Sequence, residues 1–177
     1  VLDNSTRAFI LDTAIETLTG DLHVEAARKG PMISVSAGAA GATSQKGIAV
    51  AGSFSANVLL DETEAYLEYV NKAVIAGDTL VKASDTARII AIGGGIAYGG
   101  KAGVGLGFGL NLLGTDQNPT LTRAYIKNSV LEMNDGTLEV SVRNENTDGT
   151  DPRIIAVGGG IGISSPSQGK IGIGAYM

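Results

Sequence analysis

Residues 88–96 read Arg-Ile-Ile-Ala-Ile-Gly-Gly-Gly-Ile, and residues 153–161 read Arg-Ile-Ile-Ala-Val-Gly-Gly-Gly-Ile, which differs at one position. A match of this length inside a chain of 177 residues is not expected by chance and indicates an internal repeat. Both stretches join aliphatic residues to three glycines, a composition that suits strands approached closely by other backbone. The fold prediction therefore starts from a repeated, glycine-rich strand.

A second block of sequence shows that the repeat occurs three times. It reads Thr-Arg-Ala-Phe-Ile at 6–10, Thr-Glu-Ala-Tyr-Leu at 63–67 and Thr-Arg-Ala-Tyr-Ile at 122–126. The alignment is fixed because the alanine of this block and a later glycine keep the same spacing in every copy. The pairs with this spacing are Ala8 and Gly20, Ala65 and Gly77, and Ala124 and Gly136.

Each copy ends in a run of alternating residues. These runs are Ile48–Asn57, Ala102–Asn111 and Lys170–Met177. We therefore treat residues 1–177 as one continuous repeat domain made of copies 1–57, 58–111 and 112–177. The two chain ends align with neighbouring positions of the repeat, so we expect this chain to be a segment of a longer polypeptide.

Period-two alternation, the signature of a half-buried strand, dominates all three copies. Leu22, Val24 and Ala26 share one face of a predicted strand, while His23 and Glu25 share the other. In the run at 102–111, glycines occupy one whole face, which lets another sheet approach. Turn residues separate the runs and no long amphipathic helix is evident, so the sequence predicts an all-β chain.

Short strands repeated every 54 to 66 residues predict a β-solenoid with close-packed glycine-rich strands, in the form of a right-handed parallel β-helix. We expect each copy to make two or three coils of roughly 20 to 30 residues. If copies neighboured one another directly, Arg7, Glu64 and Arg123 would form a charge ladder. If several coils lie between two copies, the three residues do not meet and the alternation of charge is accidental. The expected number of coils favours this second interpretation.

Composition excludes several classes of function. A formal net charge of −5 argues against a nucleic-acid surface, which needs clustered Lys and Arg. The absence of cysteine excludes disulfide and thiolate chemistry. No apolar run approaches the roughly 20 residues of a membrane-spanning helix, so we expect no membrane span.

Three features of the sequence resemble chemical sites, but each has a simpler structural explanation. The segment 95–102 resembles a phosphate-binding loop but has Ala102 where Ser or Thr would hold magnesium, which favours a glycine-rich strand turn. His23 is the only histidine and is placed on an outward face. The loop 144–151 is rich in oxygen ligands but lacks EF-hand spacing, so a solvated loop is favoured over a calcium site. We assign no catalytic, cofactor or metal residue and predict no enzyme.

The carriers of a family resemblance are Asn57 to Leu67, Arg88 to Asn111, Arg123 to Ile126 and Arg153 to Ile161. These tracts resemble the repeats of giant bacterial surface adhesins and exoproteins of the autotransporter, filamentous-haemagglutinin-like and leukotoxin-like kinds. The resemblance implies a β-solenoid stalk at the bacterial cell surface or in the extracellular space, without catalytic residues and with an unidentified ligand.

Two other functions stay open at this point. A self-assembling extracellular fibre subunit would stack end to end through open strand edges. An eight-stranded outer-membrane barrel fits the length and the alternation, but the low aromatic content and the absence of Trp argue against it.

Overall fold

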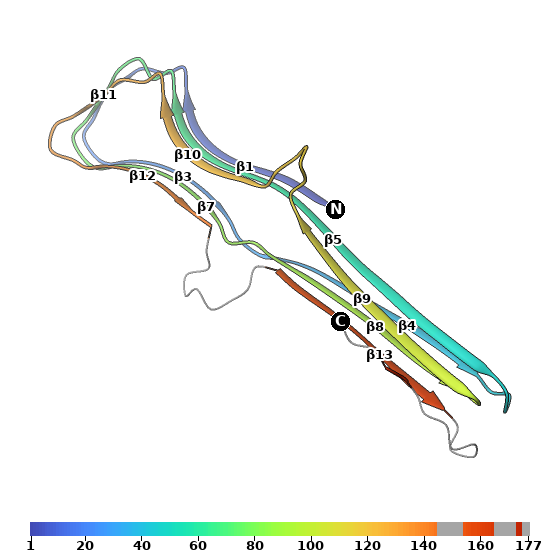
Figure 1. Ribbon diagram of the computed structural model, residues 1–177. Helices are drawn as coiled ribbons and strands as arrows, with labels where there is room; N and C mark the ends of the chain where they lie inside the picture. Colours follow the sequence, from blue (N-terminus) through green and yellow to red (C-terminus); the bar gives the residue numbers. More distant parts are fainter. Residues whose placement is uncertain (145–153, 165–172, 175–177) are drawn as a thin grey trace.

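A computed structural model describes residues 1–144, 154–164 and 173–174 of the chain. The described residues form strands joined by turns and contain no helix, which confirms the all-β prediction (Figure 1). The strands are β1 (Leu2–Leu11), β2 (Ile15–Leu18), β3 (Leu22–Arg28), β4 (Pro31–Ala42), β5 (Ile48–Glu68), β6 (Ala73–Ile75), β7 (Thr79–Asp85), β8 (Arg88–Gly99), β9 (Ala102–Leu113), β10 (Leu121–Lys127), β11 (Leu131–Met133), β12 (Leu138–Arg143), β13 (Ile154–Ser164) and β14 (Ile173–Gly174).

Each strand lies parallel to, and hydrogen-bonds with, its counterpart in the next copy. The sheets have the orders β11-β6-β2, β12-β7-β3 and β13-β8-β4, and a fourth sheet joins β1, β5, β9, β10 and β14. Copy 2 therefore lies at the centre, with copies 1 and 3 on its two sides. Equivalent segments of the three copies run side by side, and together they form a long, flattened molecule (Figure 1).

One copy makes one complete circuit of this body. Leu2 lies beside Leu59, and Glu62 lies beside Leu121, so the chain returns to its starting position only after a whole repeat. The expectation of two or three coils per copy is wrong. The physical reason is the length of the extended segments: β5 alone runs for 21 residues before the chain turns.

The corner after the first long segment has the same backbone conformation in every copy. Asp12, Tyr69 and Asn128 follow β1, β5 and β10 and have φ values of 48°, 53° and 51°. This left-handed region is unfavourable for a side chain as bulky as tyrosine. Three unlike residues at equivalent positions adopt this left-handed conformation. The path of the chain therefore imposes the corner, whatever the local residue type.

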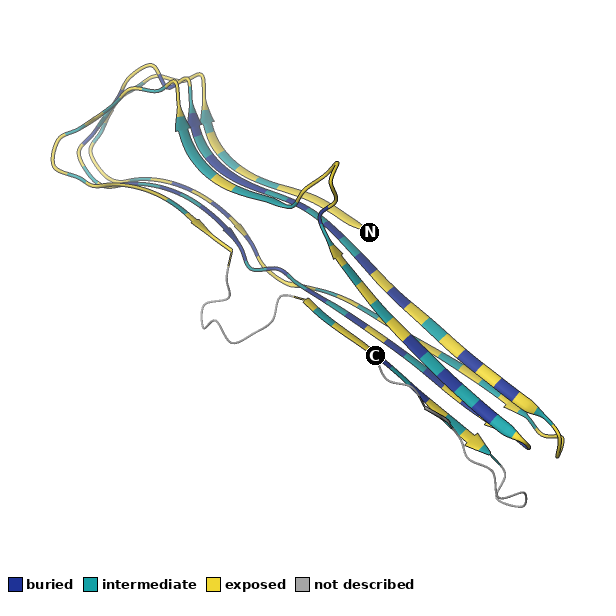
Figure 2. Cartoon of the chain, in the orientation of Figure 1, coloured by how far each residue is buried: buried dark blue, intermediate teal, exposed yellow. Residues whose placement is uncertain are grey.

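The two halves of the body have different interiors. Near this corner, β1, β5 and β10 face β3, β7 and β12 across an apolar core that includes Leu67, Val70, Ile75 and Val81, all fully buried. Buried residues alternate with exposed ones along the strands and are most frequent in the central copy (Figure 2). The inward positions Val24 and Ala26, with His23 outward and exposed, confirm the predicted faces of β3.

In the other half, the sheet of β4, β8 and β13 lies directly on β5, β9 and β14, with glycine and alanine between them. A Cβ atom placed on Gly93 would lie 2.5 Å from the Phe108 carbonyl oxygen, and one on Gly109 would lie 2.8 Å from the Ala91 oxygen. A side chain at either of these two glycines would collide with the backbone of the opposite sheet, so the predicted close approach of another sheet to the glycine face is confirmed.

Candidate functional site

A ladder of charged side chains crosses the outer surface of β1, β5 and β10. The three strands pair in register, so Arg7 and Arg123 lie on either side of Glu64. Arg7 Nε is 3.0 Å from Glu64 Oε2, and Arg123 Nε pairs with Glu64 Oε1. Glu64 is 3% exposed because the two guanidinium groups cover it. The interpretation of the charge alternation as accidental is therefore wrong.

The charges of this ladder reinforce one another. The pKa of Arg7 is raised, first by its hydrogen bond to the Glu62 carboxylate and then by the charge of that group. A hydrogen bond to Glu64 raises the pKa of Arg123 in the same way. Four residues further along the strands, Lys127 Nζ donates to Glu68 Oε1 at 2.8 Å, and this bond raises the pKa of Lys127. The ladder therefore favours the charged form of each of these cations.

An aromatic ladder runs beside the charges. The rings of Phe9 and Tyr66 stack with centroids 5.3 Å apart, and those of Tyr66 and Tyr125 stack with centroids 4.9 Å apart. The Arg123 guanidinium lies 5.3 Å from the centre of the Tyr125 ring, a distance at which a cation attracts the ring face. Burial raises the pKa of the Tyr125 hydroxyl. Together the rows lock one copy onto the next in a single register.

An inner ladder of amides ties the two glycine-rich sheets together. Asn57 is buried, and its amide donates to the Asn111 Oδ1 and to the Ile90 carbonyl, both at 2.9 Å. Asn111 in turn donates to the Ile155 carbonyl. The asparagines that close copies 1 and 2 therefore link copy to copy and sheet to sheet.

A buried ionic cluster lies where the two halves meet. Arg28 of copy 1 pairs with Asp61, and its Nη1 is 3.7 Å from Asp85 Oδ1, both of copy 2. Asp85 also accepts a hydrogen bond of 2.9 Å from the backbone N–H of Ala87. Buried charges are tolerated only when paired, so this cluster fixes copy 1 against copy 2. No sequence pattern indicated this cluster, because Arg28 and Asp85 occupy equivalent positions but are unlike residues.

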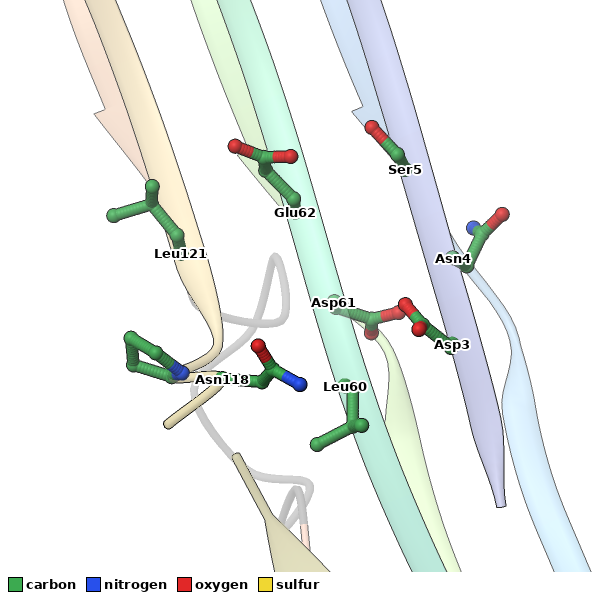
Figure 3. A pocket seen from close by; sticks show the side chains of 9 residues that line it. Asp3, Asn4, Ser5, Leu60, Asp61, Glu62, Asn118 and Leu121 are labelled. Atoms are coloured by element: carbon green, nitrogen blue, oxygen red, sulfur yellow. The ribbon is translucent and has the colours of Figure 1, made fainter. Parts of the chain in front are cut away.

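A notch of about 280 Å³ lies on the surface where β1, β5 and the start of β10 meet. In Figure 3 the carboxyl groups of Asp3 and Asp61 point toward one another. Asp61 is paired with Arg28, and Glu62 at the rim is paired with Arg7. The remaining lining residues are Asn4, Ser5, Leu60, Asn118, Pro119 and Leu121. Two of its three carboxylates thus serve the ion pairs already described, and the notch has no assembled reactive group.

The structure places the residues singled out from the sequence as follows. Segment 95–102 forms the end of β8, a turn and the start of β9, which confirms the predicted strand turn. His23 lies on the exposed face of β3 beside Leu80. The loop 144–151 and the run 170–177 fall outside the described residues, except for 144 and 173–174. Within the described ranges, no three His, Asp or Glu side chains gather in a way that would hold a metal ion.

Apolar side chains cover the outer surface of the glycine-rich half. In β8, Ile92, Ile96 and Tyr98 are exposed between inward-facing glycines and alanines. In β9 and β5, Phe108 and Phe54 are exposed in the same way. The large residues therefore face outward and the small residues face the opposite sheet.

Comparison with known proteins adds no assignment: no family model, no curated protein and no solved structure matches this chain. Among the described residues, no helix has the length and apolar character needed to cross a membrane. The contacts described above bind copies of one repeat to each other through charge, aromatic and amide ladders.

Proposed function

We propose that this chain is a structural spacer, a stretch of the stalk of a larger secreted bacterial surface adhesin or exoprotein. The observation that carries the proposal is the direct, in-register pairing of all three copies, with Arg7, Glu64 and Arg123 in one row. Each copy uses its neighbours to complete its ion pairs and stacks. A unit of this kind gains stability and length by repetition, which is what a stalk requires.

The finer fold that we propose is a right-handed parallel β-solenoid in which each copy is one flattened coil. Each circuit leads from one strand to a parallel strand of the same sheet, as from β1 to β5. Connections of this type are right-handed in about 98% of cases. The resemblance to adhesin repeats supports the same fold and the extracellular location.

The alternative is a subunit that forms fibres by stacking end to end, and the charge ladder disfavours it. The row that contains Glu64 ends in Arg7 on one side and in Arg123 on the other. If copy 3 of one molecule met copy 1 of the next in register, these two arginines would lie opposite each other. Like charges directly opposite are destabilising, and a neighbouring repeat with an acidic residue would fit better at either end.

Electron microscopy of the chain over a range of concentrations tests the proposal. A spacer segment gives isolated short rods, and a fibre subunit gives continuous filaments that lengthen with concentration. The complete reading frame is the second test, because an array predicts further copies with an acidic residue at the position of Glu64. Filaments from this chain alone would overturn the spacer, and compact globules would overturn both functions.

A further inference from the structure

The outer face of the sheet β4–β8–β13 is uncharged over the area where its three strands pair. Five rows of outward residues cross this face at right angles to the strands. The rows are Ile33, Ile90, Ile155; Val35, Ile92, Val157; Ala37, Gly94, Gly159; Ala39, Ile96, Ile161; and Gly41, Tyr98, Ile163. The Tyr98 hydroxyl is the one polar side-chain group in these rows. A contiguous aliphatic face of this kind marks a site of association.

The face is grooved as well as apolar. The row of Ala37, Gly94 and Gly159 has almost no side chain, and the rows on both sides carry Ile or Val. The result is a groove of about 550 Å³ that runs across all three strands. Its walls include Ile96, Val157 and Ile161, which are about half exposed. A partner that fills the groove needs a straight ridge of aliphatic groups with the spacing of stacked strands, roughly 4.8 Å.

We propose that a second copy of this chain docks on this face, sheet against sheet. The ridge of Val35, Ile92 and Val157 lies next to the groove, about 7 Å away along the strands. The two molecules would be related by a two-fold axis that lies between the ridge row and the groove row and runs parallel to the direction in which the three strands stack. Rotation about this axis places the ridge of each molecule over the groove of the other. Because the pairing is isologous, both grooves are filled at once. The chain thus supplies its own complementary surface, in the manner of a steric zipper.

The size of the face sets the strength of this pairing. Three strands at about 4.8 Å and nine residues at about 3.3 Å give a footprint of roughly 400 Å² on each molecule. A standard stable interface buries about 800 Å² on each side, so three copies form a weak, concentration-dependent dimer. Each added copy widens the footprint by a third of its present value. Long arrays would therefore associate side by side much more firmly than this segment.

The opposite outer face, on β5 and β9, lacks this complementarity. There the outward Gly52 pairs with Leu106, which fills the row that would otherwise form a groove. Phe54 and Phe108 project from the next row and are exposed. This difference supplies a matched control, because Gly52 and Gly94 are both outward glycines with no atom within 4 Å of an added Cβ.

The test compares Gly94→Lys with Gly52→Lys by sedimentation equilibrium over a range of concentrations. Both variants are expected to keep the fold, as checked by circular dichroism and thermal unfolding, since an added Cβ meets no other atom at either position. Gly94→Lys buries an ammonium group in the dimer and raises the dissociation constant at least about tenfold. Gly52→Lys changes it by less than about twofold. Sodium sulfate strengthens the wild-type dimer, because the contact is apolar.

Two results would overturn the proposal. One is a wild-type chain that stays monomeric at the highest concentration reached, and the other is an equal effect of the two lysine variants. Neutral phosphatidylcholine vesicles serve as a further probe. If the chain stays monomeric but binds these vesicles, and Gly94→Lys abolishes that binding, the face belongs to a lipid surface. Side-by-side dimers and end-to-end filaments differ in electron micrographs. The absence of dimers would overturn this proposal alone, and the presence of filaments would overturn the spacer function alone.

Discussion

Two adjacent glycines of β8 should respond to the same substitution with opposite sign. Gly93 faces the opposite sheet, where an added Cβ would lie 2.5 Å from the Phe108 carbonyl oxygen and 2.7 Å from its backbone nitrogen. Gly94 faces outward and an added Cβ would have no atom within 4 Å. Gly93→Ala is therefore expected to destabilise the protein, and Gly94→Ala to stabilise it.

The magnitude follows from the geometry. Ordinary carbon contacts begin at 3.4 Å, so alanine at 93 forces the two sheets apart by about 1 Å or distorts β8. Overpacking of this kind costs about 1–3 kcal/mol. Both substitutions stiffen the unfolded chain equally, a gain of about 0.4–1 kcal/mol, so the difference between the two variants reports the clash alone.

Urea denaturation followed by far-UV circular dichroism measures both changes in the free energy of unfolding. In thermal unfolding, a chain of this size shifts its midpoint by about 2–4 °C for each kcal/mol. Equal midpoints for the two variants, or a Gly93→Ala variant at least as stable as wild type, would refute the close packing of the two sheets through glycine.

Three further perturbations test side-chain contacts between neighbouring copies. Glu64→Gln removes the carboxylate between Arg7 and Arg123 and should lower the free energy of unfolding by about 1.5–3 kcal/mol in urea denaturation. Asn57→Ala leaves the Ile90 carbonyl without its buried amide donor and should lower it by about 1–3 kcal/mol in the same assay. The third concerns Asp78, whose pKa is lowered by hydrogen bonds from the backbone N–H and then the hydroxyl of Thr137. The charged Asp78 therefore stabilises the fold above its unfolded pKa of about 3.9, and this contribution is lost as the pH falls through the lower folded pKa. Asp78→Asn should thus reduce the fall of the melting temperature with decreasing pH on the acid side.

Each of these variants has a control at an exposed residue of the same type: Glu16→Gln, Asn4→Ala and Asp116→Asn. A Glu64→Gln variant as stable as Glu16→Gln would contradict the buried ion pairs. If Asn57→Ala matched Asn4→Ala, the amide ladder would have no energetic role. An unchanged acid profile in Asp78→Asn would contradict the lowered pKa of Asp78.

Much of the fold could be predicted from the sequence because the relevant patterns are local. The spacing between Ala8 and Gly20, kept in every copy, fixed the alignment that the strand pairing reproduces. Alternation in β3 separated inward Val24 from outward Glu25. The glycine face of β9 predicted the close approach of another sheet. Each of these features depends on residues near one another in the chain.

The candidate interaction surfaces were harder to predict. Arg7, Glu64 and Arg123 were visible as equivalent positions, but their contact depends on how many coils separate two copies. The role of Asn57 had a weak signal, an asparagine recurring 54 positions later, without any indication of its partner. The outward exposure of Ile92 and Ile96 contradicts the usual expectation that the larger residues of an alternating strand face the core.

Three aligned copies, all-β structure and the two faces of each strand follow from periodicity, which can be read along the chain without knowing how distant segments pack. Only the folded chain shows that one copy makes one circuit and that the sheet meeting the glycine face of β9 is the equally glycine-rich sheet of β4, β8 and β13. That outcome depends on the packing of sheets distant in sequence: two glycine faces can approach to backbone contact, and the aliphatic rows opposite them are then left on the surface.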